Sequence, residues 1–131
     1  MARTITIPPL ASGDLKIAAA LDGEILRIKM SGIVDMRDPQ TILNPYWEKV
    51  DKEIVSAGLQ QVELDVRGVD FMNSSGIICM VRWITQAKAR APDEAYHIVV
   101  QHEPAIGWQK KTIPLFLKLA PGLVTLGGKA T

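Results

Sequence analysis

The chain has 131 residues, of which 47% are hydrophobic, and its 15 basic and 14 acidic residues give a formal net charge of +1. This length suits one domain of ordinary size, with enough apolar side chains for a buried core. The balanced charge lacks the basic excess that favours nucleic acid or an anionic membrane surface, so neither is expected as a partner.

Other residue types narrow the class of protein further. Cys79 is the only cysteine, which excludes an internal disulfide and a thiolate metal cluster. The residues from Met1 to Pro8 lack the pattern of a signal peptide, and no apolar run reaches the ~20 residues that span a bilayer. His97 and His102 have no acidic or thiol cluster beside them at ligand spacing. We therefore expect a cytoplasmic protein without membrane insertion, metal or cofactor.

The first third of the chain predicts strands. Ile5–Ile7 is a short β-prone segment closed by Pro8-Pro9, expected as an edge strand or a lead-in. Residues 14–21 and 24–30 are both expected to be strands. Asp22-Gly23 between them is a hairpin signal.

The first helix has two competing starts. Asp38 precedes Pro39, and Asn44 precedes Pro45; both pairs fit an N-cap followed by proline in the first turn. The second start is favoured because four apolar side chains then share one helical face and Gly58 follows as a stop. These four are Tyr46, Val50, Ile54 and Ala57.

The middle of the chain predicts a strand followed by a helix. Residues 62–67 alternate strictly between apolar and polar, which is typical of a half-buried strand. A turn is expected at Gly68. The helix should begin at Asn73 or Ser74 and end near Arg90. Its apolar stripe consists of Ile77, Met80, Val81, Ile84 and Ala87.

The last third adds a strand at residues 96–100, a helix from Pro104 towards Ala120, and a short final strand at residues 123–126. Pro114 should kink or divide that helix. Strands alternating with helices predict an α/β or α+β fold with a mixed sheet of about four to six strands. The early hairpin should be antiparallel, the helix-connected strands parallel, and the helices packed mainly on one face.

One short segment, Asn73-Ser74-Ser75-Gly76, places two hydroxyls where a strand enters a helix. Asn73 or Ser74 would cap the helix by accepting a hydrogen bond from a free backbone N–H. Gly76 would leave the first turn without a side chain, so another molecule could approach. Capping alone explains this spacing without any function.

The longer stretch from Val62 to Ile77 resembles the core motif of the STAS family. In that motif an apolar strand ends in Leu-Asp, a Val-x-Phe-Met/Leu turn follows, and Asp-Ser-Ser/Thr-Gly opens a helix. The resemblance covers nearly the whole chain, as one STAS-like domain over residues 1–131. The matching segments are Leu64-Asp65, Val69–Met72 and Asn73–Gly76, and Gly32–Asp35 looks like the Gly-Glu-Leu-Asp of the family.

The resemblance implies a regulatory protein similar to an anti-sigma-factor antagonist rather than an enzyme. In such antagonists a partner, an anti-sigma factor or related serine kinase, phosphorylates the first serine of the motif, and a PP2C-type phosphatase reverses this. The phosphosite would then be Ser74, with Ser75 as a secondary hydroxyl. The resemblance also leaves open whether the chain forms a homodimer. The expected partner-binding residues are Asp35, Asn73, Ser75, Gly76, Cys79 and Trp83.

Two alternatives follow from features of this chain. Asn73 stands where the family has an acidic residue and Ile33 where it usually has Glu, which favours a STAS scaffold or transport-complex subunit without phosphorylation. A small-molecule sensor or enzyme with a pocket near Ser74 would be a different class, but no catalytic constellation supports it. For Trp83, an exposed partner anchor and burial within a broad helix face are equally consistent with the sequence.

Overall fold

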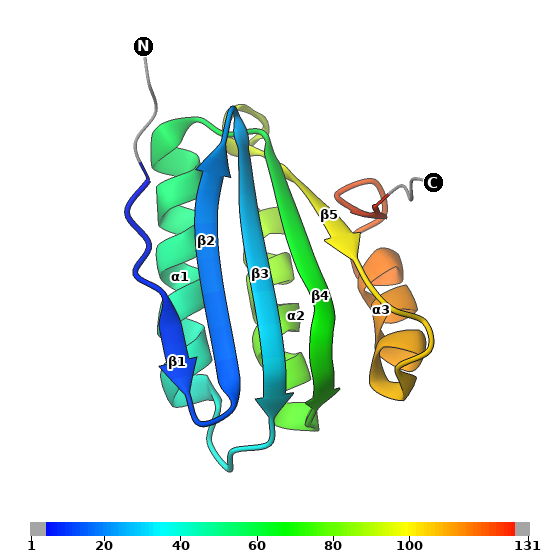
Figure 1. Cartoon of the computed structure of the whole chain (residues 1–131). Coiled ribbons are helices and arrows are strands. Elements are labelled where there is room, and N and C mark those ends of the chain that lie inside the picture. Colours follow the sequence, from blue (N-terminus) through cyan, green and yellow to red (C-terminus); the bar gives the residue numbers. More distant parts are fainter. Residues whose placement is uncertain (1–4, 128–131) are drawn as a thin grey trace.

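The computed structural model describes residues 5–127, which form one mixed sheet covered by helices (Figure 1). The six strands lie side by side in the order in which they occur along the chain. The first three pair antiparallel and the later ones parallel, as expected. They are β1 (Leu10–Ser12), β2 (Leu15–Asp22), β3 (Ile25–Val34), β4 (Gln61–Met72), β5 (His97–Gln101) and β6 (Val124–Leu126).

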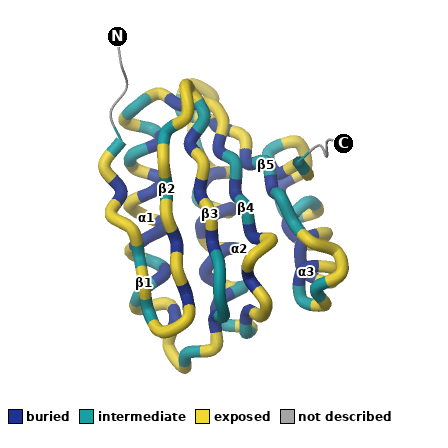
Figure 2. The backbone as a smooth tube through the Cα atoms, viewed as in Figure 1, coloured by how far each residue is buried: buried dark blue, intermediate teal, exposed yellow. Residues whose placement is uncertain are grey.

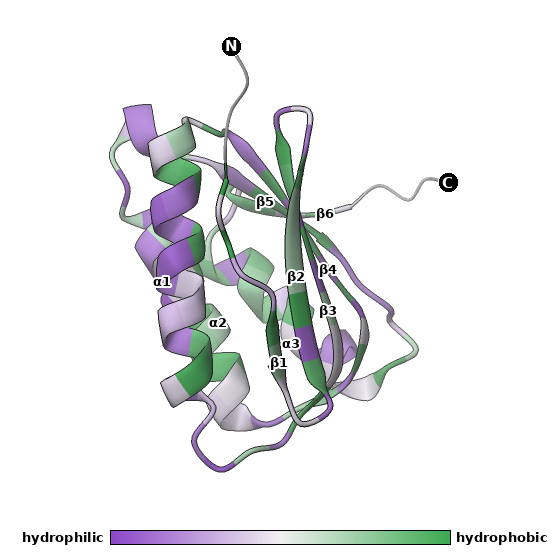
Figure 3. Ribbon diagram, turned by 60° about the vertical axis from the view of Figure 1, so that its left-hand side comes forward, coloured by the Kyte–Doolittle hydropathy of each residue, from purple (hydrophilic) through white to green (hydrophobic). Residues whose placement is uncertain are grey.

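Three helices cover one face of this sheet (Figures 1 and 3). They are α1 (Gln40–Ala57), α2 (Ser74–Lys88) and α3 (Gly107–Leu119), and a short 3₁₀ turn, η1 (Pro92–Glu94), follows α2. Each parallel strand is added on the same side of the one before it, so right-handed crossovers place every helix on the same face. The opposite face is open to solvent, and along the strands buried residues alternate with more exposed ones (Figure 2). The expected architecture is confirmed.

The N-terminal segment was expected as an edge strand or a lead-in, and it is a lead-in. Residues 5–9 form no strand, and Ile7 packs into the core as a lead-in. The Thr6 N–H donates to the Glu53 carboxylate on α1 at 3.0 Å rather than to a strand. The edge strand is β1, which begins beyond the two prolines that cannot donate to a ladder.

The first helix begins at the start that was not favoured. α1 starts at Gln40 with Pro39 at its N-cap, and Pro45 lies inside it. The Ile42 and Leu43 N–H groups already bond to the Pro39 carbonyl. Burial of Leu43 holds this early turn in place, and it outweighs the one hydrogen bond that Pro45 cannot donate. The expected stop at Gly58 is confirmed, with φ 69°.

Strand β4 does not turn at Gly68 but runs on to Met72. Its register with β3 shifts twice, once beside Gly68 and once before Phe71. Each shift inserts one residue, so Val69 and Met72 still face the core. A Cβ at Gly68 would lie 3.1 Å from the Ser31 Cβ, which explains a glycine at this close approach.

The third helix begins three residues later than expected and is not divided. Residues before Gly107 form a turn in which the Ile106 N–H donates to the Glu103 carbonyl at 3.0 Å. Pro114 lies inside α3, where Ile113 and Phe116 are buried beside it. The expected final strand is confirmed as β6, parallel to β5.

Candidate functional site

The N-terminus of α2 is built around the side chain of Asn73. Its Oδ1 accepts a hydrogen bond from the Gly76 N–H at 2.8 Å, so Asn73 is the N-cap. Its Nδ2 donates to the Met36 carbonyl at 2.9 Å, and its backbone N–H donates to the Val34 carbonyl at 2.9 Å. Asn73 therefore joins α2 to the end of β3 and to the loop that leads into α1.

These contacts give Asn73 a structural reason to be an amide. A carboxylate at this position could accept from Gly76, but it could not donate to the Met36 carbonyl. It would instead bring two oxygen acceptors together. The departure from the acidic residue of the family motif thus coincides with a hydrogen bond that only the amide can make.

Ser74 is the first residue of α2, and its side chain is exposed. No residue in the described part of the chain makes a hydrogen bond to its hydroxyl. The first turn of α2 contains no acidic side chain. The free N–H groups and the dipole of the helix therefore favour a negative group at this end, and no carboxylate of this turn already supplies one.

Several expected site residues come together around Ser74. Ser75 is half-buried in the same turn, and Asp35 is exposed in the loop that Asn73 binds through Met36. Ile78 lies one helical turn after Ser74 and is 65% exposed. Phe71 is 48% exposed at the end of β4, where it points to the opposite side of the sheet from the buried Met72. The site is therefore an exposed hydroxyl with polar and apolar side chains beside it. Neither exposed apolar side chain was singled out from the sequence, although the motif itself contains Phe71.

Two of the expected partner-binding residues are buried and cannot contact a partner. Trp83 is 0% exposed and Cys79 is 2% exposed. The Trp83 ring stacks on Trp47 with centroids 4.4 Å apart. Burial also raises the pKa of the Cys79 thiol. For Trp83 this is burial within a broad helix face, one of the two readings that the sequence left open, and α2 is buried there where it packs against α1.

Gly76 is also buried, and its role differs from the one expected. A Cβ here would lie 2.8 Å from both the Met72 Cγ and the Val34 Cγ1. The missing side chain lets α2 approach the sheet of its own molecule, not another protein.

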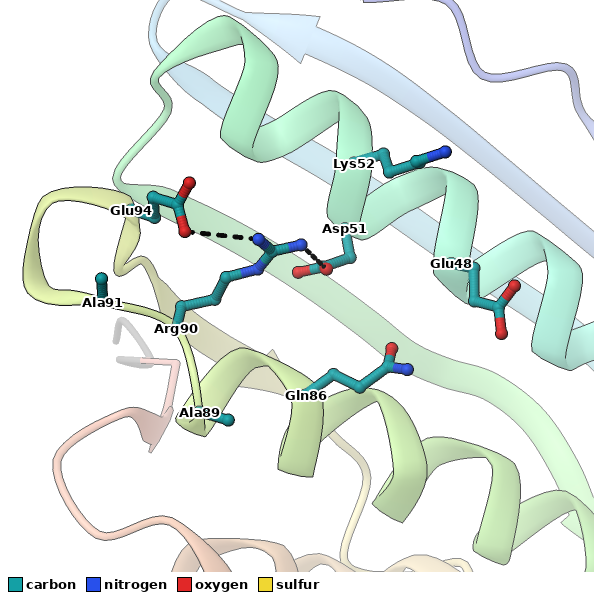
Figure 4. A pocket seen from close by; sticks show the side chains of 8 residues that line it. All are labelled: Glu48, Asp51, Lys52, Gln86, Ala89, Arg90, Ala91 and Glu94. Atoms are coloured by element: carbon teal, nitrogen blue, oxygen red, sulfur yellow. Dashed lines mark hydrogen bonds and ion pairs between the residues drawn. The ribbon is translucent and has the colours of Figure 1, made fainter.

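A polar network lies at the C-terminal end of α2, and Figure 4 shows the part of it in which Arg90 bonds to Asp51 and Glu94. Asp51 of α1 is 5% exposed and accepts from the Tyr96 hydroxyl at 2.7 Å and from Arg90 at 2.5 Å. Trp83 Nε1 donates to the same Tyr96 oxygen at 3.0 Å, and Arg90 also reaches Glu94 at 3.3 Å. Burial, and then the bond to Asp51, hold the pKa of Tyr96 well above its ordinary range.

A cavity of about 470 Å³ opens beside this network, between α1, α2 and η1. This cavity lies at the opposite end of α2 from Ser74, so it is not the pocket near Ser74 that the small-molecule alternative would use. A sequence signal for the network exists: Asp51 is an acidic residue at helical spacing between the apolar Trp47 and Ile54. The lining residues are Glu48, Asp51, Lys52, Gln86, Ala89, Arg90, Ala91 and Glu94.

Two further observations concern metals and membranes. Within residues 5–127, no three His, Cys, Asp or Glu side chains gather as metal ligands would. His97 instead faces the Gly122 carbonyl, with Nδ1 at 3.0 Å. No helix in the described part of the chain combines the length and apolar character needed to cross a membrane.

Comparisons with known proteins agree with this fold. No protein-family model matches the chain, and no curated protein matches it. Among solved structures, the crystal structure of an anti-sigma factor antagonist from Mycobacterium paratuberculosis aligns with a TM-score of 0.56. The alignment covers 92% of each chain at 16% sequence identity. The chain therefore shares its fold with that structure, and the fold expected from the sequence is confirmed.

Proposed function

We propose that this chain is a regulatory protein-interaction domain that is switched by phosphorylation of Ser74. In its unphosphorylated form it would bind an anti-sigma factor or related serine kinase, and so release another client of that kinase. The kinase would then phosphorylate Ser74, and a PP2C-type phosphatase would reverse the modification. The chain is thus the substrate and the switch, and the catalytic groups belong to its partners.

The observation that carries this proposal is the exposed Ser74 hydroxyl at the first position of α2, which makes no hydrogen bond with any of the residues that the structure describes. Phosphorylation there would add roughly −1.5 to −2 charges at neutral pH. The free N–H groups of the helix terminus tolerate such a charge, so the domain can stay folded.

The same charge would act differently on a docked partner. Ile78 offers apolar contact one helical turn after Ser74, and Asp35 adds a carboxylate in the neighbouring loop. A partner seated over these side chains would have to desolvate the new phosphate, and any acidic group opposite Ser74 would repel it. Release of the partner therefore requires no change of fold.

The direct test is intact-mass measurement after incubation with an anti-sigma-type serine kinase and Mg-ATP. We expect one phosphate on the wild type and on Ser75→Ala, and none on Ser74→Ala. Because Ser75 lies in the same turn but is half-buried, Ser75→Ala is the matched control. Equal phosphate uptake by Ser74→Ala and the wild type would reject the assigned site.

A second candidate keeps the fold without the switch, as a constitutive scaffold or transport-complex subunit. The bond from Asn73 Nδ2 to the Met36 carbonyl favours it, because a neutral amide replaces the acidic residue of the motif. A pull-down separates the two candidates. Under the switch, Ser74→Asp loses partners that wild type binds; under the scaffold, it keeps them all.

A further inference from the structure

Positive charge is concentrated near the C-terminal end of the chain. Residues 104–131 contain four lysines and no acidic residue, whereas residues 1–103 contain eleven basic and fourteen acidic residues. Three of these lysines lie on α3, at positions Lys110, Lys111 and Lys118, and all three are exposed. None of them forms an ion pair with another residue in the described range. The whole-chain charge of +1 conceals this asymmetry.

An exposed leucine lies in the middle of these lysines. Leu115 is 58% exposed, four residues after Lys111 and three before Lys118, so the three side chains share one stripe of the helix. Lys111 and Lys118 are seven residues apart, which is about 10 Å along the helix axis at about 1.5 Å per residue. The basic face of α3 is defined here as Lys110, Lys111, Pro114, Leu115 and Lys118, all of them exposed.

The opposite face of α3 fixes the helix firmly to the sheet. Gln109 is fully buried, and its Nε2 donates to the Val66 and Val69 carbonyls at 2.7 and 2.9 Å. Trp108 Nε1 donates to the Val69 carbonyl at 2.8 Å. α3 is the last helix of the layer and contacts α2 on one side only (Figure 1). The basic face is therefore held rigidly while it remains uncovered by the described residues.

The nearest charged groups on neighbouring elements do not neutralise this face. Glu103, in the loop before α3, accepts from the Ala105 N–H of its own loop and interacts electrostatically with Arg67 of β4. On α2, Lys88 donates to the Leu119 carbonyl and adds a further positive charge.

We propose that the basic face of α3 is a docking surface for an acidic helix of a partner protein, separate from the Ser74 site. Carboxylates on the partner would face Lys111 and Lys118, and an apolar contact would cover Leu115 between them. α3 supplies what such a partner needs: positive charges opposite its carboxylates, lysines spaced along one stripe, and an apolar side chain between them.

A membrane and a nucleic acid fit this face less well. A helix that lies on a membrane buries a broad apolar face, but the apolar side of α3 is already used against the sheet. Binding of nucleic acid commonly adds arginine or aromatic side chains that stack on bases, and the basic face has neither.

The test uses the full chain, labelled with ¹⁵N, and a synthetic helical peptide. In the peptide a leucine follows one glutamate by four residues and precedes another by three. We expect amide shifts confined to α3 and the residues packed on it, and an affinity that falls as salt rises. The double variant Lys111→Glu/Lys118→Glu should weaken binding by roughly tenfold or more at low salt. Leu115→Ala should weaken it several-fold with the salt dependence unchanged.

Two controls make the result specific. Lys16→Glu reverses one exposed lysine on the open face of the sheet, and it should bind within about twofold of the wild type. Ser74→Ala should bind the peptide as the wild type does, so failure of the phosphorylation switch and failure of this surface are distinguishable.

Several outcomes would overturn the proposal. One is equal binding of a scrambled peptide with the same composition, and another is binding that survives reversal of both lysines. Tighter binding of phosphatidylserine vesicles or duplex DNA through the same lysines would replace the partner protein by a membrane or a nucleic acid. Self-association of the chain through α3 would assign the face to a second copy.

Discussion

At its N-terminal end, α2 joins the rest of the fold through its backbone and a single amide side chain, whereas at its C-terminal end it takes part in a chain of buried polar groups. The amide is that of Asn73, bonded to Met36 and Gly76. The polar chain runs from Trp83 through Tyr96 and Asp51 to Arg90. One helix thus has an end with an exposed hydroxyl that makes no hydrogen bond within residues 5–127, and an end where a buried carboxylate and a buried tyrosine are bonded.

This difference shows where the fold can accept a new charge. A charge added at Ser74 meets solvent, free N–H groups and no acidic residue in its turn. A charge removed at Asp51 leaves the buried Tyr96 hydroxyl without its acceptor and Arg90 without its more buried partner, and an unpaired buried group is costly because water cannot replace the bond. The N-terminal end is therefore suited to chemical modification, and the C-terminal end to holding α1, α2 and β5 together.

The largest effect is expected from Asp51→Ala. This change leaves Arg90 and the Tyr96 hydroxyl without their shared acceptor, so we expect the free energy of unfolding to fall by about 3–5 kcal/mol. Denaturant unfolding followed by circular dichroism measures the change. The matched control is Glu48→Ala on the same helix, which removes an exposed ion pair with Arg82 and should cost less than about 1 kcal/mol. Similar losses in the two variants would contradict the assigned role of the network.

Unfolding at alkaline pH tests the polar network at the C-terminal end of α2 without mutating any of its residues. Both tyrosines have a raised pKa: Tyr46 to about 12 through burial, and Tyr96 beyond that through burial and Asp51. The raised values in the folded state mean that stability is full below the unfolded pKa, near 10, and falls as pH rises above it. Between its unfolded and its folded pKa, each tyrosine should lower the free energy of unfolding by up to about 1.4 kcal/mol per pH unit.

The measurement is ultraviolet absorbance of tyrosinate beside circular dichroism across the alkaline range. We expect tyrosinate to appear together with unfolding rather than before it. In the Tyr46→Phe variant Tyr96 is the one tyrosine left, so the tyrosinate absorbance reports on it alone. This substitution should cost little stability, because the Tyr46 hydroxyl is buried without a hydrogen-bond partner among the described residues. Ionisation of Tyr96 at its ordinary pKa in a folded chain would show that the hydroxyl is not held as described.

These two ends also differ in how far the sequence could predict them. The N-terminal end was predicted well, because capping depends on local residue types such as Asn73 followed by Gly76. Its surroundings were predicted less well. For Trp83 the sequence left a partner anchor and burial equally open, and burial is what the structure shows; Cys79 was expected at a partner surface but is buried too. The burial of Trp83 depends on Trp47 of α1, which is distant in sequence. The C-terminal network was missed because its bonds join residues 13 to 45 positions apart.

The same distinction explains the errors in the elements. Pro45 is a local signal for a helix start, but burial of Leu43 overrides it. Gly68 is a local signal for a turn, but pairing with β3 carries the strand through it as a bulge. Contacts that form only in the folded chain decided both cases.

A smaller effect is expected at the N-cap. Asn73→Asp keeps the acceptor for the Gly76 N–H but loses the donor to the Met36 carbonyl, so we expect a loss of about 1 kcal/mol in the free energy of unfolding. Asn73→Ala loses both bonds and should cost more, about 2 kcal/mol. Thermal unfolding of the two variants at neutral pH measures the order. If Asn73→Asp were more stable than the wild type, the amide would not be the better fit to this loop.

The smallest effect on stability is expected from Ser74→Asp, and this is the most direct test of the contrast. The new carboxylate lies at the first position of α2, where the helix dipole favours a negative charge by about 0.3–1 kcal/mol. The hydroxyl that it replaces makes no hydrogen bond within the described residues. Stability should therefore stay unchanged or rise by a few tenths of a kcal/mol, and Ser74→Lys should lower it by a similar amount. A loss above about 1 kcal/mol in Ser74→Asp would mean that this end cannot accept a phosphate without unfolding, and the proposed switch would then need a change of fold.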